Sequence, residues 1–260
     1  MPTVKEIETY LFSLAPKELA MGWDNVGLLV GQTEHPVHSV LVALDITEDV
    51  VDEAIETGAE LIVAHHPVMN CKWLPVQTVR DDTCQGRILT KMLRNEISGI
   101  CMHTNLDIAE GGINDLLAKA LKLTKVEPLG EDGCGRVGWL LKKTEMADFT
   151  EAVYDALGCT GLRFVSAGKD VQHVAVGGGA CWEYHRDALA KGCDTFVTSD
   201  LSYHDFLDAK ALGLNVIDAG HFPTEDVVCP YLVASMKKKY PELTVQKSRS
   251  HREVFQYFTK

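Results

Sequence analysis

Residues 37–66 read VHSVLVALDITEDVVDEAIETGAELIVAHH, and this stretch decides the fold class. An apolar strand, a polar turn, a helix that stops at Gly58 and a second apolar strand follow one another, which is the pattern of an α/β unit with parallel strands. Glycine directly after the last helical residue is a typical stop signal. The second strand, LIVA, ends in the neighbouring histidines His65 and His66. We therefore predict an α/β fold with polar side chains at a strand end.

The chain contains this pattern twice. Residues 171–200, VQHVAVGGGACWEYHRDALAKGCDTFVTSD, align with the first stretch without a gap, and the similarity resumes between ISGICMHTNLD (97–107) and NVIDAGHFPTE (215–225). Both of these later segments end in His-x-x-x-acid. The first copy carries extra residues, which fall in the turn-rich segment 70–85 and predict a surface loop. The pattern indicates an internal duplication.

The duplication predicts two similar α/β lobes, residues 1–126 and 127–260, divided near the Pro- and Gly-containing segment 123–135. In open α/β sheets, ligands bind in the crevice outside the carboxyl ends of the strands. The polar clusters of this chain all follow directly after apolar strands. A site in the cleft between the two lobes, lined by strand ends of both, is the expectation.

The side chains at these strand ends favour a divalent metal. Three imidazoles and two carboxylates supply nitrogen and oxygen ligands without a thiolate, which suits Zn, Fe, Mn, Co or Ni. Five protein ligands are too many for one catalytic ion with an open position, and they suit two ions bridged by a carboxylate. The candidate ligands are His65, His66, Asp107, His221 and Glu225. Each also has a structural reading, because a carboxylate stabilises or caps a helix N-terminus and histidines form ordinary hydrogen bonds.

Composition narrows the class of protein. Lys and Arg total 25 against 37 Asp and Glu, and the formal net charge of −12 disfavours non-specific binding to nucleic acid or to an anionic membrane. The eight cysteines form no C-x-x-C pair and read as reduced, buried thiols. The N-terminus reads as an amphipathic helix, not as a signal peptide, and no apolar run is long enough to span a bilayer. A cytoplasmic location is the expectation.

Several motifs resemble the NIF-three-like dinuclear-metal family, whose bacterial members are commonly called GTP cyclohydrolase 1 type 2 homologues. These motifs occur in the family's order over nearly the whole chain: WDNVGLLVG (23–31), AHHP (64–67), HTNLD (103–107), GGINDLLA (111–118) and AGHFPTE (219–225). The resemblance implies two interlinked α/β domains and a toroidal homohexamer with its metal pairs facing an internal cavity.

The same resemblance implies a ligand assignment. His65 and His221 would bind one ion, His66 and Asp107 the other, and Glu225 would bridge both. The chain departs from the family pattern at Ser199, where Gly is usual, at Thr224, where Ser is common, and near position 254, where a Pro is expected. None of these changes removes a ligand, but they weaken any inference about the substrate.

Three further polar residues, His103, Asp200 and His204, are candidates for proton transfer or for orienting a ligand. Simple structural hydrogen bonds are an alternative reading. The glycine cluster GGGACWE (177–183) matches no phosphate-binding motif and predicts a tight turn.

We expect a metal-dependent hydrolase that acts on an unidentified small molecule, which could be a nucleotide. The alternative is a non-enzymatic metal-binding, interaction or scaffold protein. The surplus polar side chains at the strand ends favour the enzyme, because metal storage needs only the ligands themselves.

Overall fold

The computed structural model describes residues 1–70, 76 and 78–258. The chain forms a mixed α/β fold with two separate sheets, which agrees with the predicted fold class. It divides into two compact units, each made of two chain segments: Met1–Ala109 with Val228–Arg252, and Glu110–Val227 with Glu253–Lys260. We call these unit 1 and unit 2. They divide the chain differently from the contiguous lobes 1–126 and 127–260, because a late strand joins the first sheet.

Unit 1 contains a five-stranded sheet with the strand order β1-β4-β3-β2-β11. Its strands are β1 (Gly27–Val30), β2 (Ser39–Ala43), β3 (Leu61–Ala64), β4 (Ser98–Cys101) and β11 (Thr244–Lys247). Its helices are α1 (Val4–Leu14), η1 (Lys17–Leu19), α2 (Glu48–Thr57), α3 (Cys84–Arg94), α4 (Thr104–Ile108) and α10 (Val228–Lys239). Only β1 runs antiparallel to its neighbour, so the other four strands end at the same edge of the sheet.

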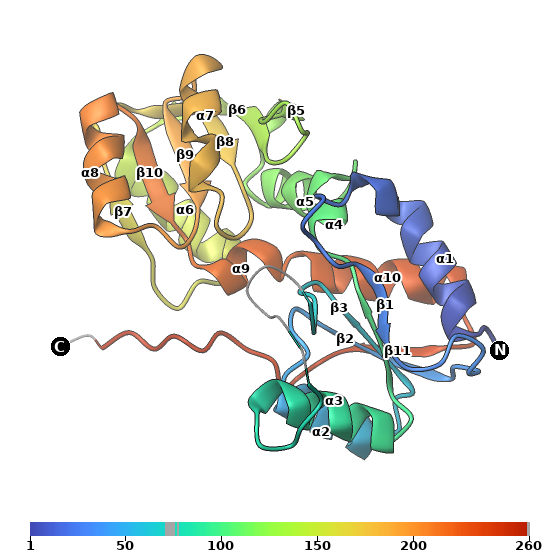
Figure 1. Ribbon diagram of the computed structural model, residues 1–260. Coiled ribbons are helices and arrows are strands. Elements are labelled where there is room, and N and C mark those ends of the chain that lie inside the picture. The colour runs from blue at the N-terminus through green and yellow to red at the C-terminus, as the bar shows by residue number, and fades with distance from the viewer. Residues whose placement is uncertain (71–75, 77, 259–260) are drawn as a thin grey trace. The chain divides into compact units, whose positions relative to one another are not determined.

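The helices of unit 1 cover both faces of its sheet. In Figure 1, α2 and α3 lie together on one face and α10 lies on the other. One core cluster joins Leu41 and Ile62 of the sheet to Val50 of α2 and Met92 of α3. Alternate strand residues face the other side, which is why β3 is apolar along its whole length and β2 is apolar after Ser39.

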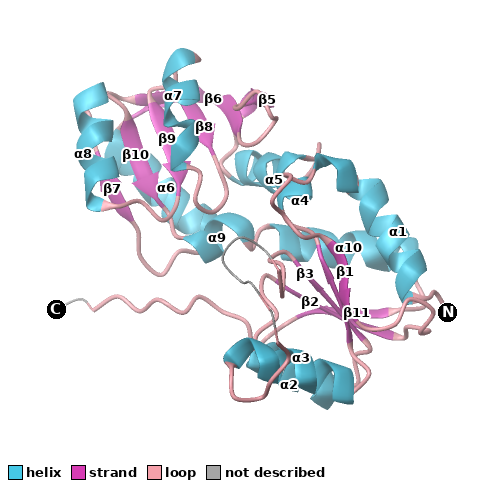
Figure 2. Ribbon diagram, in the orientation of Figure 1, coloured by secondary structure: helices cyan, strands magenta, loops and turns pink. Residues whose placement is uncertain are grey.

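Unit 2 contains a six-stranded sheet with the order β5-β6-β8-β9-β10-β7. Its strands are β5 (Thr124–Pro128), β6 (Arg136–Thr144), β7 (Arg163–Val165), β8 (Val171–Val176), β9 (Thr195–Thr198) and β10 (Asn215–Asp218). Its helices are α5 (Ile113–Ala120), α6 (Met146–Leu157), η2 (Trp182–Tyr184), α7 (His185–Ala190), α8 (Tyr203–Leu212) and α9 (His221–Glu225). The central strands β8, β9 and β10 are parallel, and Figure 2 shows the strands of this sheet among the helices of the unit.

The segments aligned in the two copies of the sequence pattern occupy corresponding elements. LIVA is β3 and TFVT is β9, and each is the middle strand of a parallel trio. The helix of the first copy ends at Gly58 in a left-handed conformation with φ of 68°, as the sequence predicts. The origin of this similarity by duplication stays a prediction.

Two local expectations need correction or restriction. Residues 71–75 and 77 of the predicted loop 70–85 lie outside the described residues, and α3 already begins at Cys84, capped by Thr83. From sequence, residues 225–240 predict one helix that is opened by Glu225 and broken or kinked at Pro230, but α9 ends at Glu225 and α10 begins at Val228. Pro230 therefore lies in the first turn of α10, where its missing N–H breaks no helical hydrogen bond, and no break occurs at it.

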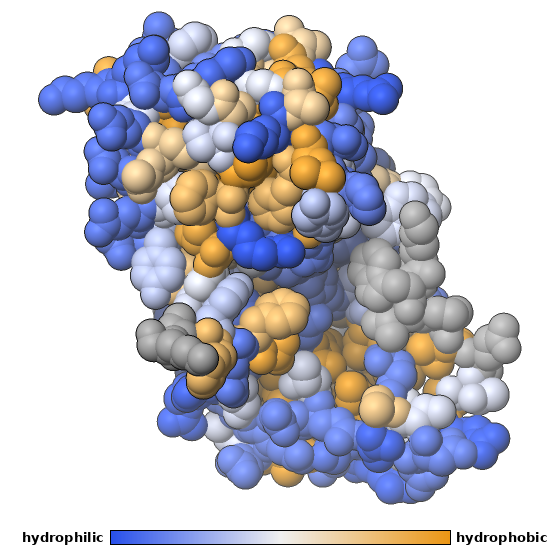
Figure 3. Space-filling model, turned by 90° about the vertical axis from the view of Figure 1, so that its left-hand side faces the viewer, coloured by the Kyte–Doolittle hydropathy of each residue, from blue (hydrophilic) through white to orange (hydrophobic). Residues whose placement is uncertain are grey.

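The described surface agrees with the composition. Figure 3 shows hydrophilic residues over much of one face, in keeping with the net charge of −12. Within the described ranges, no helix is both long and apolar enough to cross a membrane.

The described cysteines are buried as expected except for Cys84. Seven cysteines are described as free thiols, of which Cys84 is exposed and the others are buried, while Cys71 lies outside the described residues. Burial raises the pKa of the Cys193 thiol to about 12, so this group stays protonated.

A buried carboxylate of α2 binds the backbone of the residues that follow β11. Glu53 is 5% exposed and accepts hydrogen bonds from the Ser248 hydroxyl at 2.6 Å and from the backbone N–H groups of Arg249 and Ser250 at 3.0 Å. Burial opposes its ionisation, but these donors outweigh burial and lower the pKa of Glu53 from 4.5 to about 2. The ionised form is therefore the one that stabilises the fold.

This pKa predicts how stability depends on pH. The contribution of Glu53 is complete above pH 4.5 and disappears as the pH falls from 4.5 through about 2, because the carboxylate becomes protonated. Glu53→Gln should lower the free energy of unfolding at pH 7 by roughly 1.5–3 kcal/mol. Urea unfolding, measured between pH 2.5 and 7 with a chelator present, should give free energies of unfolding for wild type and variant that converge as the pH falls. Parallel pH curves would contradict this role.

Candidate metal centre

The carboxyl edge of the sheet in unit 1 gathers the first group of polar side chains. The parallel register sets Ala43 of β2 beside Ala64 of β3, and Ala64 beside Cys101 of β4. The residues that follow these positions therefore leave the sheet at one edge. His65 and His66 follow β3 and His103 follows β4, and ligand atoms of these three histidines lie within 4.8 Å of one another.

Each of these three rings holds its Nδ1 against an oxygen. His65 Nδ1 lies 2.7 Å from the backbone oxygen of Met102, and a carbonyl oxygen only accepts, so His65 Nδ1 carries the proton. His66 Nδ1 lies 2.8 Å from Asp45 Oδ1, and His103 Nδ1 lies 2.9 Å from Asp24 Oδ1. With the proton on Nδ1, the lone pair of a neutral imidazole is on Nε2. This tautomer is the one that a metal bound at Nε2 requires.

The two aspartates are held as carboxylates. Burial opposes ionisation of Asp24, but the hydrogen bonds and charge of His103, together with Thr104, lower its pKa to about 2. Asp24 Oδ2 also accepts from the backbone N–H of Thr104 at 3.0 Å. Burial likewise opposes ionisation of Asp45, but its hydrogen bonds with His251 and His66 hold its pKa well below the ordinary range. Both groups therefore accept hydrogen bonds from the imidazoles and cannot donate one.

Asp107 joins this cluster from α4. The helix starts directly after His103 and brings Asp107 Oδ1 to 3.7 Å from His65 Nε2. Asp107 is buried and is the fourth residue of the five-residue helix, so it is not the capping residue that its sequence position also permitted. Unit 1 thus combines imidazole nitrogens with a carboxylate oxygen.

Unit 2 presents a second group at the carboxyl edge of its own sheet. Asp200 follows β9, and α9 follows β10 and carries His221 and Glu225 one helical turn apart. That spacing places both side chains on one face of α9, with His221 Nε2 3.0 Å from Glu225 Oε2. On its other side, His221 Nδ1 lies 2.7 Å from Asp200 Oδ2. His221 therefore repeats the pairing of Nδ1 with an oxygen that the other three histidines show.

The electrostatics of this second group favour a positive charge. Burial lowers the pKa of His221, but the charge of Glu225 and the hydrogen bonds with Asp200 and Glu225 outweigh burial and raise it to about 11. Asp200 adopts a left-handed backbone conformation with φ of 57°, which is uncommon outside glycine. A cation at the position between His221 and Glu225, either a proton or a metal ion, is thus stabilised.

The glycine cluster after β8 makes room for Glu225. A Cβ atom added at Gly179, whose φ is +62°, would lie 2.2 Å from Glu225 Oε1. The N–H of Gly179 donates to the Thr224 hydroxyl at 3.1 Å and ties the turn to α9. The cluster is the tight turn that the sequence predicted, and its glycines serve the close approach of a carboxylate.

His204 occupies a different setting. It is exposed on α8 and contacts the Tyr203 ring, with the ring centroids 5.5 Å apart. The groups of possible metal ligands among the described residues do not include it. Sequence reasoning did not single out Asp24, Asp45 or His251 as functional. Asp45 could have been found, because it follows β2 at the edge that also carries His65 and His66.

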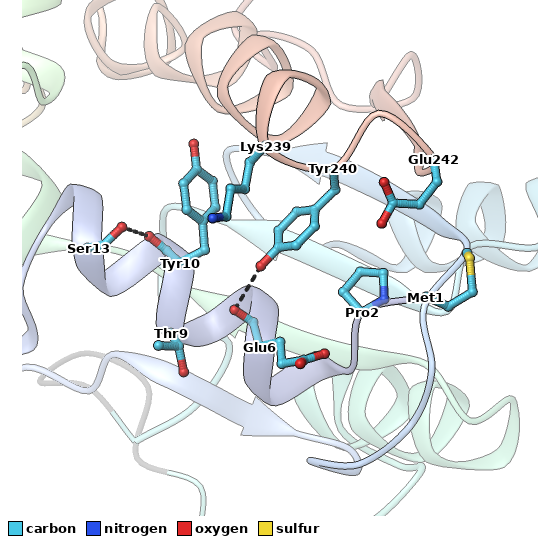
Figure 4. A pocket seen from close by; sticks show the side chains of 9 residues that line it. All are labelled: Met1, Pro2, Glu6, Thr9, Tyr10, Ser13, Lys239, Tyr240 and Glu242. Atoms are coloured by element: carbon cyan, nitrogen blue, oxygen red, sulfur yellow. Dashed lines mark hydrogen bonds between the residues drawn. The ribbon is translucent and has the colours of Figure 1, made fainter.

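Unit 1 also has an open pocket of about 650 Å³ that is formed by other residues. Figure 4 shows the side chains that line it, which come from the N-terminus and α1 and from the end of α10 and the residues that follow it. Lys239 lies over the rings of Tyr10 and Tyr240, at 5.7 and 5.9 Å from their centroids, and Tyr240 donates to the backbone oxygen of Glu6. Its lysine and tyrosines thus pack against each other, and none of the strand-end residues lines it.

The donor set fits a divalent metal. Groups of histidine and carboxylate side chains that could hold an ion occur among the described residues, and they contain no cysteine. Nitrogen and oxygen donors of this kind suit first-row divalent metals, and hydrogen-bonded Nδ1 atoms orient the rings for ligation through Nε2.

Comparisons with known proteins agree with one another. A family model described as Duf34/NIF3 (NGG1p interacting factor 3) matches residues 2–253. A Clostridium perfringens protein named GTP cyclohydrolase 1 type 2 homolog is 36% identical, over 85% of this chain and 86% of its own. A Streptomyces coelicolor protein of the same name is 36% identical, over 86% and 82% of the two chains. A crystal structure of a Bacillus cereus protein related to NIF3 superposes with a TM-score of 0.93 at 28% identity, covering 99% of each chain.

Proposed function

Because the chain belongs to the Duf34/NIF3 family, we propose that it binds two divalent metal ions and uses them to hydrolyse a small molecule. The proposed ligands are His65 and His221 for one ion and His66 and Asp107 for the other, with Glu225 bridging both. The observation that carries the proposal is the shared state of four histidines. His65, His66, His103 and His221 each hold Nδ1 against an oxygen at 2.7–2.9 Å.

This shared state supports metal binding because the four histidines also belong to groups of possible metal ligands. His38 and His185 hold Nδ1 against an oxygen at 3.0 and 2.8 Å as well, but neither belongs to such a group among the described residues. Ligation through Nε2 requires the proton on Nδ1 and an oxygen to hold it there. His65 is 0% exposed and Glu225 is 3% exposed, and a buried cation would balance the charge of the buried carboxylate.

The reaction class follows from the chemistry of such a centre. When bound, a pair of divalent cations activates water and polarises a carbonyl, imine or phosphoryl oxygen. His103 is outside the proposed ligand set, and its ring lies 5.0 Å from that of His65. Asp24 Oδ1 lies 2.9 Å from His103 Nδ1 and fixes the orientation of the ring, so His103 Nε2 can accept a proton from water and return it to a leaving group. A protein that only stores metal has no use for this pair.

The substrate class is open to experiment. The curated relatives carry the name GTP cyclohydrolase 1 type 2 homolog, so nucleotides are the first compounds to test. Phosphoesters and cyclic amides should accompany them, because the same Lewis-acid chemistry serves all three. We also propose self-association into a homohexamer, which light scattering after gel filtration would measure.

A variant of the proton carrier tests the enzyme hypothesis. We expect the protein loaded with zinc, manganese or iron to hydrolyse one of these compound classes. His103→Gln should lower kcat by roughly 100- to 10,000-fold, because it removes the acid–base group. Both variant and wild type should still hold two ions per chain by mass spectrometry.

His38→Gln is the matched control. His38 is an exposed histidine of unit 1 whose Nδ1 pairs with Glu60 at 3.0 Å, and it follows no strand end of the site. The kcat of His38→Gln should equal that of wild type. A His103→Gln protein as active as wild type would overturn the proposed role of His103. No turnover by wild type over the whole panel would favour the non-enzymatic metal-binding protein instead.

A further inference from the structure

The segment that follows β11 reaches a candidate metal ligand through an aspartate. Asp45 uses both carboxylate oxygens: Oδ1 lies 2.8 Å from His66 Nδ1, and Oδ2 lies 3.0 Å from His251 Nε2. His66, Asp45 and His251 thus form a continuous hydrogen-bonded chain within unit 1. His251 is absent from the proposed ligand set and from the proposed acid–base pair.

The backbone of this segment is held at two places. β11 pairs with β2 in parallel, and Ser248 extends the pairing by donating its N–H to the Val42 oxygen at 2.7 Å. The Glu53 carboxylate then accepts from the Ser248 hydroxyl and from the next two backbone N–H groups. The Ser248 hydroxyl oxygen in turn accepts from the N–H of His251 at 3.1 Å. His251 is therefore placed by a network that begins on α2.

Asp45 needs such a second partner. Its side chain is 41% exposed, so a single hydrogen bond would leave it able to rotate toward solvent. The side chains of His66 and His251 are only 14% and 10% exposed. A carboxylate held through both oxygens by two largely buried rings has one orientation, and it imposes that orientation on His66.

We propose that Ser248–His251 is a positioning arm, in which His251 orients Asp45 and Asp45 orients the metal ligand His66. This inference rests on the proposed function, since it assigns His66 to an ion. Glu53 fixes the arm and His251 is its end point. The arm makes the affinity for one of the two ions depend on a residue that does not itself bind metal.

Metal affinity tests the arm, measured by competition with a chromophoric zinc chelator. Asp45→Asn should weaken binding of one zinc ion by roughly 10- to 100-fold, and His251→Ala by about tenfold, as for other partners of ligating histidines. The double variant should bind no more weakly than Asp45→Asn, because His251 acts only through Asp45. His251→Gln retains an N–H donor and should recover part of the affinity.

Two controls separate positioning from stability. His38→Ala removes a histidine–carboxylate pair of similar length on the surface of unit 1 and should leave zinc affinity unchanged. Thermal unfolding of the metal-free variants shows whether any loss follows from a weaker fold. Unchanged zinc affinity in both Asp45→Asn and His251→Ala would overturn the proposal, as would an additive double variant.

Nitrogen NMR of the imidazoles distinguishes failure of this inference from failure of the proposed function. In metal-free wild type, His66 should show the Nδ1–H tautomer, and His251→Ala should shift the His66 Nδ1 resonance while His38→Ala does not. Absence of that shift overturns the arm even where zinc binds. Wild type that binds no zinc but shows the shift overturns the metal proposal and retains the orientation of His66 by His251.

Discussion

Replacing Glu225 by Ala is expected to remove both metal ions together. Glu225 is the proposed bridge, so its loss takes one ligand from each ion and leaves His221 without the carboxylate that lies 3.0 Å from its Nε2. His66→Ala, by contrast, takes a ligand from one ion only. Mass spectrometry of metal content after dialysis should count close to zero ions per chain in Glu225→Ala and about one in His66→Ala.

Glu151→Ala provides the control for this experiment. Glu151 is an exposed glutamate of α6 in the same unit, and Glu151→Ala should hold as many metal ions per chain as wild type. Glu225→Gln adds a second test, because it keeps the shape of the side chain and removes the charge that raises the pKa of His221. Two ions per chain in Glu225→Ala would refute the bridging assignment.

Gly179→Ala is expected to weaken metal binding although it replaces no ligand. The new Cβ would lie 2.2 Å from Glu225 Oε1 and 3.1 Å from His221 Cε1, so both side chains must move. The left-handed backbone of Gly179 adds a conformational penalty of about 1–2 kcal/mol for alanine. Zinc affinity should fall by at least the 10- to 100-fold that loss of a supporting partner causes.

Gly158→Ala separates the two effects. Gly158 ends α6 with φ of +64°, close to the +62° of Gly179, and a Cβ there meets no atom within 4 Å. The penalty of a left-handed alanine is therefore common to both variants, whereas only Gly179→Ala adds a steric clash and should lose zinc affinity. Equal zinc affinity in the two variants would show that the turn does not support Glu225.

Local sequence patterns predicted much of this fold. The apolar run LIVA identifies β3, and the glycine that follows the last helical residue identifies the end of α2. Both signals are local, because a left-handed helix cap depends only on neighbours within one turn. The short helix α9 shows the limit of such patterns. His221 and Glu225 were recognised by their spacing, but the helix end after Glu225 and the start of α10 at Val228 were not, since Pro230 suits either a kink or a first turn.

The candidate residues could be read from sequence because each lies in a short polar segment that begins where an apolar strand ends. His65, Asp107 and Glu225 needed no knowledge of distant contacts. Their hydrogen-bond partners did need it. His103 is 79 residues from Asp24, and His251 is 206 residues from Asp45.

The sequence by itself thus determined an α/β chain with imidazoles and carboxylates placed after its strands. Tertiary structure alone decided which oxygen faces Nδ1 of each of these histidines, because that oxygen comes from another part of the chain. It also decided that β11 pairs with β2, which brings His251 to Asp45. Pairing between strands so far apart depends on the packing of the whole unit, and no local pattern encodes it.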